Sequence, residues 1–116
     1  MKKVALLDNL QFKESNPYAE PLWVDENGRV LRFMLKPGQH IREHNAPSSP
    51  FYVVVVKGEG VFSGGDGQEQ KIGPQSLLIF EPGEDHAIKA LEEELVFVGF
   101  LHGVPPELKG RSYTEQ

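Results

Sequence analysis

The chain lacks cysteine, long apolar segments and an excess of positive charge. Without cysteine, disulfides, thiolate catalysis and cysteine-ligated zinc sites are excluded. No apolar run approaches the roughly 18 residues of a membrane span. The net charge of −5 over 116 residues provides no broad basic surface for nucleic acid. We therefore expect partners other than nucleic acid or a membrane.

The N-terminal residues do not match the pattern of a secretion signal. Two lysines precede a short apolar run at the N-terminus, but Asp8 ends that run, whereas a signal peptide needs roughly 7–15 apolar residues. Together with the absence of cysteine, this favours a cytoplasmic protein. The length fits one domain, which we place at residues 1–116, with a barrel core at about 30–102, an N-terminal arm and hairpin at 1–29 and a C-terminal tail at 103–116.

Helical periodicity is absent as well, and turn signals of glycine, proline and asparagine recur about every 8–12 residues. This pattern predicts an all-β sandwich or barrel. The strands expected are Arg29–Lys36, Phe51–Val56, Val61–Ser63, Gln70–Ile72, Leu77–Phe80, His86–Ala90 and Leu95–Leu101. Phe51–Val56 consists of β-branched and aromatic residues alone, which predicts a strand buried on both faces.

The N-terminal third carries weaker signals. Val4–Leu7 is short and apolar, and we expect an edge strand or an arm there. Glu14–Glu20 is interpreted as a loop, and Asp25–Gly28 as a tight turn because Asn-Gly supplies positive φ values.

Two gapped motifs stand out against this background. In the first, five residues separate Gly38 from His44, and a strand and a Gly-Glu-Gly turn follow. In the second, Gly73 is followed by Pro82-Gly83 and then His86. The order and spacing resemble the cupin superfamily, in particular its small single-domain members. This resemblance implies a double-stranded β-helix, a jelly-roll-like barrel of two antiparallel sheets that holds ligands in its mouth.

The chain departs from the family pattern at two of the four usual metal ligands and at the closing asparagine. The second histidine of the family falls on Ala46, the glutamate on Pro50 or Phe51, and the closing asparagine on Ala90. Of the four ligands that the resemblance implies, His44 and His86 are retained. Two histidines would bind a transition metal weakly, because catalytic sites normally have three protein ligands.

Other polar residues can be interpreted in two ways. In a regular strand His40, Arg42 and His44 would share one face, with the two histidines about 13 Å apart, at or past the reach of one shared ion. Arg42 is either a partner for an anionic ligand or a solvated edge residue. Tyr52 lines a cavity or belongs to the core, and His102 is a third ligand or a surface residue.

Two functions from different classes therefore stay open. One is a barrel that binds a small molecule through His40, Arg42, His44, Tyr52 and His86. The other is a metal-dependent enzyme, of dioxygenase or isomerase type, in which His44 and His86 hold Zn, Ni, Fe or Cu. A third hypothesis, a purely structural module, predicts no polar cavity. We expect a homodimer, because an edge strand at Val4–Leu7 needs a partner and cupins commonly pair such strands across a two-fold axis.

Overall fold

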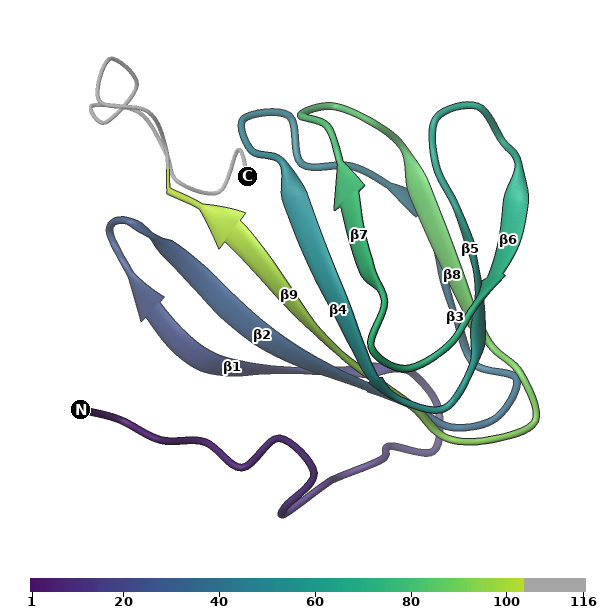
Figure 1. The fold of residues 1–116 in the computed structure, drawn as a ribbon, viewed down its shortest axis with the longest axis horizontal. Coiled ribbons are helices and arrows are strands. Elements are labelled where there is room, and N and C mark those ends of the chain that lie inside the picture. The colour runs from purple at the N-terminus through teal and green to yellow at the C-terminus, as the bar shows by residue number, and fades with distance from the viewer. Residues whose placement is uncertain (104–116) are drawn as a thin grey trace.

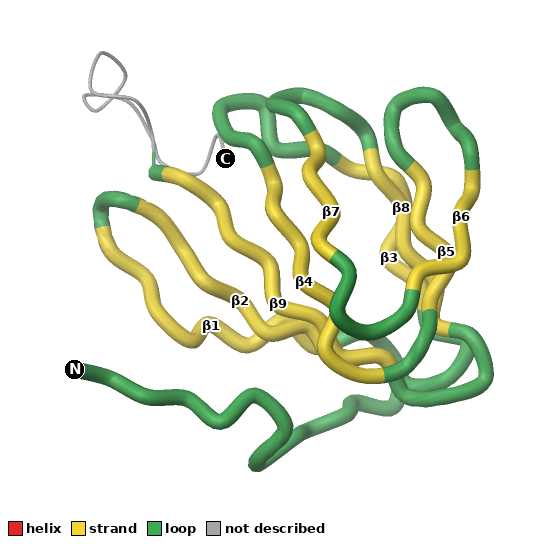
Figure 2. Tube along the Cα trace, in the orientation of Figure 1, coloured by secondary structure: helices red, strands yellow, loops and turns green. Residues whose placement is uncertain are grey.

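The computed structural model describes residues 1–103, and within this range all regular structure is β-strand (Figures 1 and 2). The strands are β1 (Tyr18–Asp25), β2 (Gly28–Leu35), β3 (His40–His44), β4 (Phe51–Lys57), β5 (Gly60–Ser63), β6 (Glu69–Ile72), β7 (Leu77–Phe80), β8 (His86–Ala90) and β9 (Leu95–His102). Over the same residues there is no helix of the length and apolarity needed to cross a membrane. The predicted tail lies outside the described residues from position 104 onward.

The strands form two antiparallel sheets that face each other (Figure 1). The large sheet has the order β1-β2-β9-β4-β7, and the small sheet has the order β3-β8-β5-β6. Some neighbours are consecutive in the chain, as β1 and β2 or β5 and β6 are, and others come from distant parts of it, as in the pairing of β2 with β9 and of β3 with β8. The predicted all-β barrel of two antiparallel sheets is confirmed.

The core lies between the two sheets, and in β4 alternate residues enter it. In β4, Phe51, Val53 and Val55 are almost fully buried, and the residues between them are half-buried. Phe97 of β9 and Ile88 of β8 join the same apolar cluster. The prediction that this strand is buried on both faces was therefore wrong, because no further layer covers the outer face of β4 completely.

The N-terminal segment agrees with expectation in one place and differs from it in another. Val4–Leu7 forms no strand, so of the two alternatives predicted there the arm is the one observed, and it leads toward the large sheet. The strand β1 includes the last three residues of the predicted loop Glu14–Glu20. The sequence pattern of this strand is weak, because Pro21 and the register shift that follows it interrupt the alternation of inward and outward residues.

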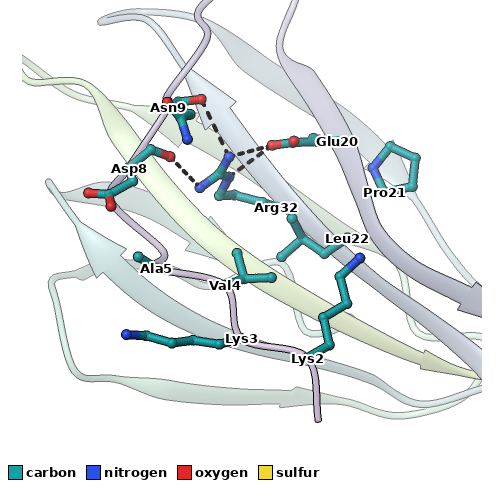
Figure 3. Close-up of a pocket in the computed structure, with 10 residues that line it drawn as sticks. All are labelled: Lys2, Lys3, Val4, Ala5, Asp8, Asn9, Glu20, Pro21, Leu22 and Arg32. Atoms are coloured by element: carbon teal, nitrogen blue, oxygen red, sulfur yellow. Dashed lines mark hydrogen bonds and ion pairs between the residues drawn. The ribbon is translucent and has the colours of Figure 1, made fainter.

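One buried arginine attaches the arm to the outer face of the large sheet (Figure 3). Arg32 of β2 is 3 % exposed. Its Nε and Nη2 donate to the carboxylate of Glu20 at 3.0 and 2.6 Å, and its Nη1 donates to the backbone carbonyls of Leu6 and Asp8 at 3.0 and 2.9 Å. A charge at this depth needs such partners, and here they come from the strand beside it and from the arm.

We predict that Arg32→Met lowers the free energy of unfolding by about 3 kcal/mol, because removal of one partner from a buried ion pair is strongly destabilising. The arm should also detach, which limited proteolysis at Lys2 and Lys3 would detect. Urea unfolding measures the stability. Lys36→Met serves as the control, since its ion pair with Glu14 is at the surface and should contribute little. An unchanged midpoint and a protected arm in Arg32→Met would contradict the prediction.

Candidate functional site

Three loops meet at one end of the barrel, the upper end in Figure 1, which we call the mouth. They are residues 45–50, 64–68 and 81–85. The first and third are hydrogen-bonded to each other: the backbone N–H of Gly83 donates to the carbonyl of Ala46 at 3.0 Å. The two segments that carry the sequence motifs are thus adjacent in space.

His86, the first residue of β8, lies at this mouth and is 2 % exposed. Residues of β8 alternate between buried and more exposed positions, which places His86 on the core side with Ile88. Its ring stacks on Phe51 at a centroid distance of 4.9 Å and lies 4.8 Å from the ring of Phe80. Nδ1 is 3.4 Å from the carbonyl oxygen of Glu84. The imidazole is therefore a polar group within an aromatic wall.

The register of β3 brings the backbone of His44 opposite His86. Ile41 pairs with Ile88 and His44 with His86, so β3 has one more residue than β8 over this stretch. Such an irregularity shifts the side-chain alternation by one position. The regular strand assumed for His40, Arg42 and His44 was therefore wrong. The bulge, which carries no clear sequence signal, sets the residue of β3 that is paired with His86.

The other predicted binding residues are exposed or belong to the outer face of the large sheet. His40 is exposed and pairs with the exposed Lys89, and Arg42 is exposed as well. Tyr52 is on the opposite face of β4 from Phe51, where its ring is 5.5 Å from that of His102. Of the predicted binding residues, the structure brings together the positions of His44 and His86.

The positions at which the family has further ligands carry apolar side chains. Ala46 is buried and the ring of Phe51 packs on His86. Ala90, where the family pattern has its closing asparagine, is buried as well. Among the residues whose side chains the structure describes, a set that excludes Glu43 and His44, no group of three or more histidine, cysteine or carboxylate side chains could hold a metal ion. These described side chains therefore do not by themselves supply the three ligands of a typical catalytic metal site.

Glu84 is a residue of the mouth that sequence reasoning missed. Its Oε2 accepts the backbone N–H of Gly65 at 2.8 Å, and its Oε1 accepts that of Glu81 at 2.8 Å. A Cβ on Gly64 would lie only 2.5 Å from Oε2, so the small residues of loop 64–68 allow this approach. These N–H groups, first that of Gly65 and then that of Glu81, lower the pKa of Glu84 below its ordinary value of 4.5.

The sequence also did not predict the structural role of Ser49. It is buried, and its Oγ accepts the backbone N–H of His102 at 2.8 Å while donating to the carbonyl of Pro50 at 2.6 Å. These bonds attach loop 45–50 to the end of β9. The hydroxyl is used in holding the loop.

The two sheets, their strand order and the mouth define a double-stranded β-helix. A family model of the cupin domain matches residues 31–100, and the chain belongs to this family. No curated protein matches the sequence.

Solved structures agree on the fold. A protein of Thermus thermophilus is 18 % identical with a TM-score of 0.83, over 90 % of this chain and 100 % of that one. An uncharacterized conserved protein with a double-stranded β-helix domain from Klebsiella pneumoniae is 19 % identical with a TM-score of 0.81, over 88 % and 90 %. An RmlC-like cupin protein of Desulfovibrio desulfuricans is 24 % identical with a TM-score of 0.77, over 87 % and 96 %.

We predict that Glu84→Gln destabilises the fold by about 2 kcal/mol at pH 7, because an amide offers one acceptor to two N–H groups that now bind a carboxylate. The folded pKa is below the unfolded one, so this contribution is complete above about pH 4.5 and is lost as the pH falls through the folded pKa. Chemical unfolding of both proteins at several pH values measures the difference. A gap between parent and variant that stays constant down to pH 2 would contradict the assignment.

Proposed function

We propose that the protein binds a small molecule in the mouth of the barrel, beside His86 and His44. The observation that supports this most directly is the burial of the His86 imidazole against the rings of Phe51 and Phe80. Ligand sites are mostly apolar concavities with a few placed polar groups. An aromatic wall with one imidazole suits a ligand that has an apolar body and one polar or anionic group.

The surrounding contacts favour a preformed site. Loop 45–50 is held by Gly83 and through Ser49, and loop 81–85 is held to loop 64–68 through Glu84. A site on loops that are fixed in advance loses less entropy when a ligand binds. His40, Arg42 and Tyr52, which the sequence also suggested, are not part of the proposal, since their positions lie away from this wall.

We expect benzoate to bind at the mouth, because it combines an aromatic ring with a carboxylate, and benzyl alcohol to bind more weakly. At about one hundred times its Kd, benzoate should raise the free energy of unfolding by about 2.7 kcal/mol. Thermal unfolding and the NMR signals of the His86 ring measure this. The effect should vanish in His86→Ala and persist in His40→Ala, which removes an exposed histidine. Unchanged unfolding and ring signals with both probes would count against the proposal.

A second candidate function is a metal-dependent enzyme, of dioxygenase or isomerase type, with a reduced ligand set. The register that places the backbone of His44 opposite His86 favours it, because directly opposed positions are the closest cross-strand neighbours. The metal would be Zn, Ni, Fe or Cu, and the apolar residues at the remaining family positions argue for weak binding.

Elemental analysis of protein purified without a metal-binding tag tests this candidate. If it holds, the parent contains near-stoichiometric metal, His44→Ala and His86→Ala lose it, and His40→Ala retains it. A parent that stays metal-free after incubation with each of the four ions excludes the enzyme candidate and leaves the binding function.

The homodimer and the cytoplasmic location expected from the sequence remain predictions, as do the domain limits. Sedimentation measures the first and cell fractionation the second. The barrel fold by itself selects no activity, since one fold supports many functions.

A further inference from the structure

A cleft opens on the side of the barrel where the two sheets end. There β6 is the last strand of the small sheet and β7 is the last strand of the large sheet (Figure 1). The cleft has a volume of about 290 Å³, and residues of β5, β6, β7 and loops 64–68 and 81–85 line it. We call it the side cleft. Ligand pockets begin at about 300 Å³, so the side cleft has room for a small molecule with one ring.

Apolar side chains from both sheets contribute to the lining of the side cleft. Phe62 of β5 and Phe80 of β7 are 3 % and 6 % exposed and belong to the core. Ile72 of β6 and Leu78 of β7 are half-buried and pack against the same core cluster. Ile79, which is exposed, completes the apolar part of the lining. An apolar ring bound here is removed from water, which is favourable.

The charge in the side cleft has one sign. Of the described residues that line it, Asp66 and Glu84 alone are charged, and its other polar side chains are those of Ser63, Gln68 and Gln70. The lining is therefore negative. A cleft lined by charge of one sign concentrates ligands of the opposite sign.

The two carboxylates keep acceptor capacity for a ligand. Glu84 accepts one backbone N–H at each oxygen, from Gly65 and from Glu81, and Asp66 accepts the backbone N–H of Gln68 at 2.9 Å through Oδ1. A carboxylate has about four acceptor sites, so each can also accept from a ligand. The N–H groups of Gly65 and Glu81 lower the pKa of Glu84, and the negative charge of Asp66 acts in the opposite direction. A cation near both carboxylates relieves the repulsion between them.

We propose that the side cleft binds a small organic cation with one apolar ring and a primary ammonium group. The ring packs against the apolar lining, and the ammonium donates to Asp66 and Glu84. Phenylalanine rings also attract a cation that lies over their faces, and Phe62 and Phe80 are both in the lining. A neutral ligand of the same shape uses the apolar lining alone, and an anion is repelled by both carboxylates.

The side cleft is distinct from the site proposed at the mouth. The ring of Phe80 lies 4.8 Å from that of His86 and also lines the side cleft, whereas His86 is not among the described residues of its lining. The imidazole at the mouth suits a polar or anionic group, and the carboxylates of the side cleft suit a cation. The inference therefore goes beyond the proposed function, because it assigns a second site with the opposite preference for charge.

NMR titration of the full chain with benzylammonium and with benzyl alcohol tests the side cleft, because the two probes share a ring and differ in charge. We expect benzylammonium to shift the methyl signals of Ile72 and Leu78 and to bind more tightly than benzyl alcohol. Raising the salt concentration from about 0.05 to about 0.5 M should weaken benzylammonium binding and leave benzyl alcohol binding unchanged, because salt screens exposed charges.

Three variants assign the binding to this lining. Asp66→Asn removes one charge and keeps the Oδ1 acceptor, and it should weaken benzylammonium binding about threefold. Gln70→Lys places an ammonium group in the side cleft and should abolish the binding. Glu69→Gln is the matched control: Glu69 is an exposed carboxylate on the same strand, but it precedes Gln70 and so points to the other face. This control should bind benzylammonium as the parent does, and cooperative thermal unfolding establishes that each variant is folded.

Several results would overturn the assignment. Benzyl alcohol that binds as tightly as benzylammonium removes the role of charge. An equal loss of affinity in Asp66→Asn and Glu69→Gln removes the role of this lining. Benzylammonium that shifts the His86 ring signals and leaves Ile72 and Leu78 unchanged binds at the mouth instead. Benzoate binding is measured at the His86 ring, so either proposal can fail alone.

Discussion

The apolar layer between the two sheets is the feature on which the rest of the molecule depends. Alternate residues of β4, β8 and β9 enter this layer, and Phe51, Ile88 and Phe97 are central to it. Because a strand exposes its two faces in turn, every residue that enters the layer sends its neighbour outward. The same alternation therefore produces the core, the aromatic wall around His86 and the apolar outer face of the large sheet.

The candidate site is a modification of that core at its open end. His86 occupies an inward position of β8, on the same side as Ile88, and the rings of Phe51 and Phe80 pack against it. At Phe51 the family pattern calls for a carboxylate on one choice of spacing. An aromatic ring there gives the histidine an apolar neighbour in place of a carboxylate oxygen, which is the kind of lining that the proposed small-molecule site needs.

Polar contacts serve mainly to hold segments that the core does not reach. Arg32 holds the arm, Ser49 holds loop 45–50, and Glu84 joins the two loops on its side of the mouth. Each of these side chains is hydrogen-bonded to the backbone of a segment distant in sequence. The arm and the mouth loops are therefore held by a few specific hydrogen bonds, whereas the two sheets are held together by apolar packing.

Turn chemistry and strand propensity determined the fold class, because both act over a few residues and can be recognised locally. The segments Leu77–Phe80 and His86–Ala90 were predicted with their observed limits, and the two motifs correctly indicated a cupin. The tertiary structure alone decided the bulge in β3 and the formation of β1 across Pro21. It also decided the hydrogen bonds of the buried Arg32 and the placement of Tyr52 on the outer face. These features depend on which strands become neighbours and in what register, and pairing between distant segments leaves no local trace in the sequence.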